Sequence, residues 1–278
     1  MDTLRINDHR RDFAGMTYVY PVLSRRAGGV SVGINLNPNN ACNWHCVYCQ
    51  VPDLVRGSAP PIDRQVLEAE LSGFLKALTE GDYLAEHVPE GLRCVRDLAF
   101  SGNGEPTTAT DFDQTVAQVV ALRDAAGLDV PVRLITNGSM MHRPAVRRGI
   151  ETLGAAKGEV WFKVDAGTRE AMARINGVDR DPTKVSEALG ECARRCPTWV
   201  QTCLFAWDGQ PPDEAAMAAY LSCLEAAGPE ALSGVLLYGV ARPSMQPEAA
   251  RITPLAPEVL EDYARVIEKK GLTVRVSP

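Results

Sequence analysis

The sequence predicts an α/β fold in which a mostly parallel sheet is covered by helices. From Gly29 onward, short apolar runs alternate with longer stretches whose apolar residues recur at helical spacing. Repeated β–α units of this kind favour parallel strands, because the crossover between two parallel strands is usually a helix. The pattern alone leaves two closures open, an open doubly wound sheet and a barrel.

The composition indicates a single globular domain. The chain has 278 residues, 45% of them hydrophobic, which suffices for one large α/β domain or two small ones. Residues 1–29 are expected to form an N-terminal extension, and residues 30–278 the main domain. The start, MDTLRINDHRRDF, is too polar for a signal peptide, and no run approaches the roughly 18 apolar residues of a membrane span. We therefore expect a cytoplasmic protein with no membrane partner.

Seven apolar runs are predicted to be the strands of the sheet. They comprise residues 30–36, 95–100, 132–136, 160–164, 199–205, 235–240 and 273–276. No glycine-rich dinucleotide fingerprint follows the first run, so a nucleotide-binding Rossmann domain is not expected.

Helices are predicted between these runs from the spacing of apolar residues. The last helix has the clearest limits, with Pro257 near its first turn and a stop at Gly271. The apolar faces of two earlier helices consist of Leu67, Leu71, Phe74, Leu75 and Leu78, and of Phe112, Val116, Val119 and Leu122.

A loop directly after the first predicted strand carries three of the eight cysteines, in the stretch ACNWHCVYCQ. In the cytoplasm such a cluster more often binds metal or does redox chemistry than forms disulfides. A structural zinc site needs four closed ligands, and His45 lies between two cysteines where it is poorly placed to be the fourth. A cube of four irons held by three thiolates would instead leave one iron open to a substrate or cofactor.

The spacing Cys42-x3-Cys46-x2-Cys49, with the aromatic Tyr48 before the last cysteine, resembles the signature of the radical S-adenosylmethionine (SAM) superfamily. The resemblance implies a [4Fe–4S] cluster on these cysteines whose fourth iron is chelated by the amino and carboxylate groups of SAM. It also implies reductive cleavage of SAM to a 5′-deoxyadenosyl radical, which abstracts hydrogen from a substrate. The implied fold is a partial (β/α)6-type TIM barrel, with active-site residues at the carboxyl ends of the strands.

Segments after the second and third strands extend the resemblance. SGNGEPT (101–107) resembles the Gly-Gly-Glu segment of the superfamily, with Asn103 in place of the first glycine. Gly104 would let the backbone approach the cofactor, and Glu105 would bind its ammonium group. In LITNG (134–138), Asn137 could hydrogen-bond the ribose or carboxylate of the cofactor. Ordinary turns would also explain both segments.

The fourth strand, VWFKVDAG (160–167), places Lys163 and Asp165 on the same face by period-two alternation. If this face lines the barrel, the two charges form a buried ion pair or serve a ligand. In the functional interpretation Lys163 binds a carboxylate of the cofactor or substrate, and Asp165 and Tyr48 belong to the cofactor site.

The order of several segments resembles the branch of wyosine-type tRNA modification synthases. These segments are residues 20–38, the SGNGEPT turn, FKVDAGT and LLYGVARP (236–243). They would place Arg25, Arg26, Tyr238 and Arg242 near the barrel mouth, so Lys163, Tyr238 and Arg242 are the predicted catalytic residues. The chain lacks cysteines before residue 42 for the second cluster of that branch, and its net charge of −6 does not favour a tRNA substrate.

The predicted function is therefore radical SAM chemistry on a small molecule, nucleoside or peptide, with a reductase such as flavodoxin or ferredoxin as electron donor. The alternatives are tRNA base modification, activation of a glycyl-radical enzyme and, from another class, a zinc or electron-transfer protein. Cys192, Cys196 and Cys203 could supply an auxiliary cluster, but buried unreactive thiols also explain them.

Overall fold

The computed structural model describes residues 3–4, 15–24 and 28–278. Its main feature is one eight-stranded sheet with the order β1-β2-β5-β6-β7-β8-β10-β12. β1 is antiparallel to β2, and every other neighbouring pair in this sheet is parallel. The strands are β1 (Val19–Ser24), β2 (Gly29–Ile34), β5 (Val95–Phe100), β6 (Val132–Thr136), β7 (Glu159–Lys163), β8 (Thr198–Leu204), β10 (Gly234–Gly239) and β12 (Val274–Ser277).

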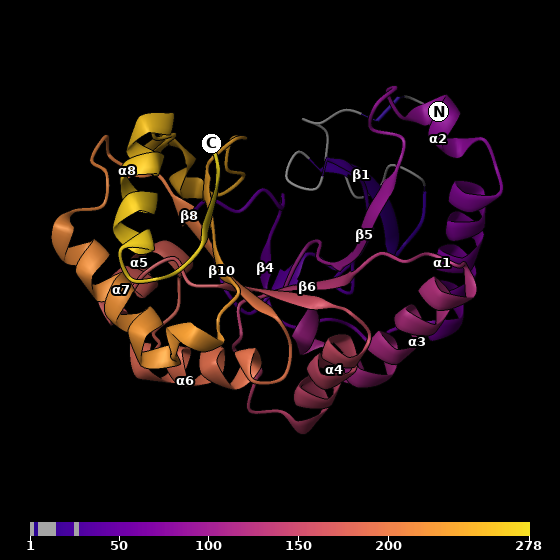
Figure 1. Cartoon of the computed structure of the whole chain (residues 1–278), viewed down its shortest axis with the longest axis horizontal. Coiled ribbons are helices and arrows are strands. Elements are labelled where there is room, and N and C mark those ends of the chain that lie inside the picture. The colour runs from indigo at the N-terminus through magenta and orange to yellow at the C-terminus, as the bar shows by residue number, and fades with distance from the viewer. Residues whose placement is uncertain (1–2, 5–14, 25–27) are drawn as a thin grey trace.

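The sheet curls into a partial barrel, which confirms the predicted fold class. Figure 1 shows the helices along the outer side of the curve, from α1 and α3 past α4 and α6 to α7 and α8. The edge strands β1 and β12 do not pair with each other, so the barrel stays open between them. All seven predicted runs are strands, each with ends within two residues of the predicted ones.

Helices cross over between the parallel strands, as the β–α alternation predicts. They are α1 (Arg64–Thr79), α2 (Tyr83–His87), α3 (Phe112–Ala125), α4 (Pro144–Ala155), α5 (Arg169–Asn176), α6 (Pro182–Ala193), α7 (Glu214–Ala227) and α8 (Pro257–Glu268). Short polar side chains start several of them: Asp63 accepts hydrogen bonds from two amides of α1, and Thr168 accepts one from α5. Among the described residues, no helix combines the length and apolar character of a membrane span.

Short elements complete the chain at the ends of the main strands. They are β3 (Ala41–Cys42), β4 (Val55–Arg56), β9 (Ala206–Trp207), β11 (Ile252–Thr253) and the 3₁₀ helices η1 (Pro106–Thr108), η2 (Pro229–Ala231) and η3 (Pro247–Arg251). β3 pairs with β4, and β9 pairs with β11.

The two faces of the sheet differ in character because side chains alternate along each strand. The convex face packs against the helices through fully buried side chains such as Leu98, Phe100 and Phe162. The concave face carries polar residues: Arg133 forms ion pairs with Asp97 and Glu159 on the neighbouring strands. The covered face therefore supplies the core, while the concave face offers polar groups toward the barrel interior.

Part of the N-terminal segment belongs to this sheet. β1 adds an antiparallel strand beside β2, and the ring of Tyr20 lies over Gly33, where a Cβ atom would come within 2.1 Å of it. The Glu70 carboxylate on α1 accepts hydrogen bonds from the amides of Thr17 at 2.7 Å and Tyr18 at 2.8 Å.

A glycine at the end of β6 is required both by its backbone and by its neighbour. Gly138 has a φ of +67°, and a Cβ atom built on it would lie 1.9 Å from the buried Phe162 ring. We predict that Gly138→Ala lowers the free energy of unfolding by about 2–4 kcal/mol, from about 1 kcal/mol of left-handed strain and about 1–3 kcal/mol of overpacking. Urea denaturation of the metal-free protein measures this loss.

Gly127→Ala is the matched control for this variant. Gly127 has the same φ of +67° but no atom within 4 Å of the added Cβ, so only the strain of about 1 kcal/mol should remain. Equal losses in the two variants would contradict the proposed packing of Phe162 on Gly138.

Candidate functional site

The cysteine loop follows β2 at the carboxyl ends of the parallel strands. Cys42, Cys46 and Cys49 are half-buried free thiols. The Cys49 amide donates to the Cys46 carbonyl at 2.9 Å, and the Trp44 amide lies 3.4 Å from the Cys42 sulfur. In the described part of the chain, no three His, Cys, Asp or Glu side chains are grouped to hold a metal ion. The thiolates of a cubane cluster bind separate irons, so they need not converge on one ion.

Asparagine side chains hold the backbone of this loop in place. The Asn35 carboxamide oxygen accepts from the Asn37 amide at 3.0 Å and from the Asn103 amide at 3.1 Å. Asn37 donates to the Ala41 carbonyl at 2.9 Å, next to Cys42. Asn40, with a φ of +52°, donates to the Pro52 carbonyl at 3.1 Å. Side-chain amides thus replace the hydrogen bonds that regular secondary structure would supply.

The SGNGEPT segment lies against this loop. The Asn103 side-chain nitrogen donates to Asn40 at 2.6 Å, while its oxygen is buried without a hydrogen-bond partner among the described residues. A Cβ atom on Gly104 would come within 2.0 Å of the Ala41 carbonyl oxygen. The glycine therefore allows the two loops to touch beside Cys42.

Glu105 is buried and joins two segments. Its carboxylate accepts hydrogen bonds from the Thr107 amide at 3.1 Å, the Thr136 hydroxyl at 2.6 Å and the Asn137 amide at 2.7 Å. Burial raises the pKa of Glu105, and these hydrogen bonds oppose the rise. The carboxylate thus ties the end of β5 to the end of β6.

Asn137 reaches the cysteine loop directly. Its side-chain nitrogen donates to the Asn43 side chain at 2.9 Å, and Asn43 donates in turn to the Ser139 hydroxyl at 2.7 Å. The structure therefore places Asn103, Gly104, Glu105 and Asn137 around the cysteine loop.

One interpretation of the sequence predicted a buried ion pair between Lys163 and Asp165. Among the described residues, no ion pair joins these two side chains. The Asp165 carboxylate instead accepts from the Tyr48 hydroxyl, from Asn176 at 2.7 Å and from the Cys203 amide at 2.9 Å. Three neutral donors satisfy this carboxylate and leave the lysine to other partners.

The Lys163 ammonium lies 3.3 Å from the Tyr238 hydroxyl and 4.9 Å from the centre of the Tyr48 ring. Burial lowers the pKa of Lys163, whereas the nearby Tyr238, Asp165, Cys46 and Cys203 raise it, and the pKa lies well above its ordinary value. The side chain lies on the concave face, where an ammonium group is suited to bind an anionic group.

The segment after β10 covers the cysteine loop from the other side. The Ser244 hydroxyl donates to the Val47 carbonyl at 2.7 Å, and the Met245 amide donates to the Cys49 carbonyl at 2.9 Å. The Gln246 side chain donates to the Cys49 carbonyl at 3.2 Å, and the Gln50 side-chain nitrogen lies 3.5 Å from the Arg242 carbonyl. The backbone of Arg242 thus lies beside the cysteine loop.

Sequence reasoning missed Ser244, Gln246, Asn176 and Arg180. The guanidinium of Arg180 is partly buried near Glu105, and its Nε has no hydrogen-bond partner among the described residues. These side chains belong to no short motif, so no local signal identifies them. Arg25 and Arg26 lie outside the described residues.

The remaining cysteines do not gather into an auxiliary site. Cys192 contacts Thr198 at 3.5 Å, and Cys196 contacts the Gly158 carbonyl at 3.5 Å. Both lie at the amino end of β8, whereas Cys203 is near its carboxyl end. Burial raises the pKa of both Cys192 and Cys196 to about 12, which agrees with buried, unreactive thiols.

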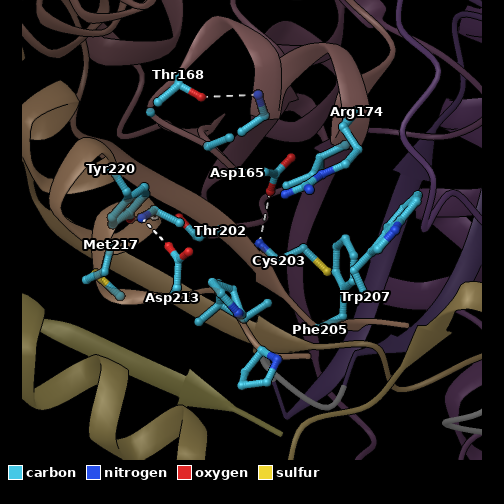
Figure 2. Close-up of a pocket in the computed structure, with 18 of the residues that line it drawn as sticks. Asp165, Thr168, Arg174, Thr202, Cys203, Phe205, Trp207, Asp213, Met217 and Tyr220 are labelled. Atoms are coloured by element: carbon cyan, nitrogen blue, oxygen red, sulfur yellow. Dashed lines mark hydrogen bonds between the residues drawn. The ribbon is translucent and has the colours of Figure 1, made fainter. Parts of the chain in front are cut away.

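A cavity of about 740 Å³ lies at the carboxyl ends of β7 and β8 and is also lined by residues of α5 and α7. Figure 2 shows Phe205 and Trp207 on one side of the cavity and Met217 and Tyr220 on the other. Asp165, which also lines the cavity, accepts a hydrogen bond from Tyr48 of the cysteine loop. The rings of Phe205 and Tyr48 are 5.9 Å apart. The volume falls within the range of small-molecule pockets.

A partial barrel with a three-cysteine loop at the carboxyl ends of its strands is the arrangement expected of a class of radical enzymes. Residues 36–221 match the Radical SAM superfamily, and the chain belongs to that family. Its cofactors are therefore a [4Fe–4S] cluster and SAM.

Solved structures share the fold. A radical SAM methyltransferase from Sphaerobacter thermophilus aligns with a TM-score of 0.62 and 13% identity over 93% of this chain and 68% of that one. Native anSMEcpe with bound AdoMet aligns with a TM-score of 0.53 and 17% identity over 87% of this chain and 63% of that one.

Two curated relatives match part of the chain. UPF0026 protein MJ1312 of Methanocaldococcus jannaschii is 32% identical over 163 residues, 58% of this chain and 44% of that protein. The GTPase Obg of Brachyspira hyodysenteriae is 28% identical over 130 residues, 46% of this chain and 16% of that protein. The chain thus matches less than half the length of either relative.

Burial leads to a prediction for the metal-free thiols. It raises the pKa of Cys46 from 9.0 to about 11 and that of Cys42 to about 12. Because the thiolate is the nucleophile, Cys46 in the folded metal-free protein should be alkylated by iodoacetamide about 100-fold more slowly than in urea near pH 8. Mass spectrometry of each cysteine peptide measures the rates.

The same shift gives a sign for the pH dependence of stability. Above pH 9.0 the unfolded chain ionises Cys46 while the folded chain does not, so the free energy of unfolding falls as pH rises toward about 11. Equal alkylation rates in the folded and unfolded states would contradict this protonation state.

Proposed function

We propose that Cys42, Cys46 and Cys49 hold the [4Fe–4S] cluster of a radical SAM enzyme that abstracts hydrogen from an organic substrate. The observation that carries the proposal is a loop with three half-buried free thiols at the carboxyl end of a partial barrel. When bound, the reduced cluster and SAM supply a 5′-deoxyadenosyl radical.

The ionisation of these thiols requires a positively charged partner such as an iron–sulfur core. Burial disfavours the thiolates of Cys42 and Cys46, and the charges of the other cysteines add to this, whereas Lys163 favours the Cys46 thiolate. Iron offsets both effects by its own positive charge, because a coordinated thiol is deprotonated.

Polar groups around the loop suit the two ends of the methionine part of SAM. The unpaired oxygen of Asn103, two residues before Glu105 in the chain, supports a role in accepting a hydrogen bond from the ammonium group. The ammonium of Lys163 and the unpaired Nε of Arg180 support binding of a carboxylate, from the cofactor or the substrate.

In this proposal Tyr48, Asn137 and Asp165 hold the cysteine loop in position beside the cofactor. Tyr48 donates to Asp165, and Asn137 donates to Asn43 between the first two cysteines. Tyr238 lies beside Lys163, and Arg242 lies beside the cysteine loop. We therefore propose that both residues contact the substrate.

The substrate is proposed to be a small molecule, nucleoside or peptide that enters the polar concave face of the barrel. A flavodoxin or ferredoxin in the cytoplasm is the proposed electron donor. The acidic chain, with a net charge of −6, favours these substrates over tRNA, so the wyosine-type reaction and glycyl-radical activation stay alternatives.

The first test is anaerobic reconstitution with iron and sulfide. We expect a brown protein with about four irons per chain, which forms 5′-deoxyadenosine from SAM and dithionite. Cys46→Ala should abolish both the cluster and the product, because one of only three anchors is lost. A colourless protein with one zinc would contradict the proposal.

Cys94→Ala is the matched control for this variant. Its thiol contacts the Gly28 carbonyl at the amino end of β5, away from the cysteine loop. Iron content and product should stay at the wild-type level. Product formation in Cys46→Ala would overturn the ligand assignment.

Lys163→Met tests the carboxylate site. Methionine keeps most of the side-chain volume but removes the charge, so we expect 5′-deoxyadenosine formation at limiting SAM or substrate to fall at least about tenfold, the worth of a charged hydrogen bond. Iron content should not change. The exposed Lys76→Met is the control, and equal rates in both variants would contradict the role of Lys163.

A further inference from the structure

The carboxyl end of α5 lies directly against the cysteine loop. The His45 amide donates to the Asn176 carbonyl at 2.9 Å, and the Val47 amide donates to the Ile175 carbonyl at 2.9 Å. These two bonds flank Cys46 on the loop and satisfy carbonyls that the helix end leaves free. These two hydrogen bonds therefore hold the loop against the end of α5.

Gly177 and Arg56 close this contact. Gly177 ends the helix with a φ of +64°, and a Cβ atom there would come within 2.9 Å of the His45 carbonyl oxygen. The Arg56 guanidinium donates to the Gly177 carbonyl at 2.7 Å and to the Asn43 carbonyl at 2.6 Å. Only a glycine lets helix and loop approach this closely.

The Asn176 side chain is 1% exposed and faces the sulfur of Cys46. Its nitrogen lies 3.3 Å from that sulfur and 2.7 Å from the Asp165 carboxylate. The two hydrogens of the amide suffice for these two acceptors.

The Asp165 carboxylate fixes which way the amide faces. A flipped amide would turn its oxygen toward the carboxylate, and two acceptors would repel each other. Asp165 is itself held by the Tyr48 hydroxyl and the Cys203 amide. The N–H group is therefore held toward Cys46 by a buried chain of hydrogen bonds.

We infer that Asn176 is a positioning residue that donates a hydrogen bond to the Cys46 thiolate and thereby raises the reduction potential of the cluster. The inference rests on the proposed function, because it requires a cluster on Cys46. A donor to a ligand sulfur stabilises the more negative state, which is the cluster after it has accepted one electron from the reductase. Asn176 would thus make that electron easier to deliver.

Asn176→Leu tests the inference, because leucine has a similar size but no donor. We expect the reconstituted variant to hold as much iron as the wild type and its midpoint potential to shift to a more negative value. A redox titration with dithionite, followed by electron paramagnetic resonance, measures the shift. Asn39→Leu is the control. Asn39 is on the same loop, but it donates to the Ser58 carbonyl and accepts from the Ala41 amide rather than contacting a cysteine sulfur, so the potential of the cluster in this variant should not move.

An unchanged potential in iron-loaded Asn176→Leu would overturn the inference. If that variant fails to fold or to bind iron, pulsed electron paramagnetic resonance of the reduced wild-type protein, labelled with ¹⁵N in asparagine side chains, decides instead. A ¹⁵N coupling to the cluster supports the hydrogen bond, and its absence overturns it. A wild-type protein that forms no cluster contradicts the proposed function itself, independently of Asn176.

Discussion

The site depends on one constraint: a loop with little regular secondary structure beyond the two-residue strand β3 must hold three thiols at fixed positions. Buried backbone groups in such a loop need partners that neither helix nor sheet provides. Asn35, Asn37 and Asn40 supply them from within the loop, and Asn137 and Asn176 supply contacts from neighbouring elements. Side-chain amides serve this purpose because each carries both donors and an acceptor without a charge.

The curled parallel sheet brings these distant side chains together. Its strands all end at one rim, so residues that follow β5, β6, β7 and β10 meet around the loop that follows β2. Glu105 ties the ends of β5 and β6, Asp165 contacts both Tyr48 and Asn176, and Ser244 holds the loop from the far side. The helices cover the convex face and leave the concave face to polar groups such as Lys163.

Strong local patterns explain what could be predicted. The apolar runs and their period locate the strands of the parallel sheet and the main helices, because burial of one face repeats every two or about four residues. The C-x3-C-x2-C spacing identifies the family. Asn176, Arg180, Ser244 and Gln246 could not be predicted, since each is a single polar residue whose role arises from a contact across the fold. The sequence also could not show whether Lys163 pairs with Asp165. The spacing of the two residues shows that they share a face of the strand, but it does not reveal the other donors that bind Asp165.

The sequence by itself determined the class of fold, the position of the cysteine loop and the family, because periodicity and motif spacing are local properties of the chain. Tertiary structure decided how the loop is held, which partners satisfy Asp165, and that Lys163 lies beside Tyr238 on the concave face. Those outcomes depend on side chains separated by many residues, such as Tyr48 and Asp165, which only the closure of the sheet brings within hydrogen-bond distance.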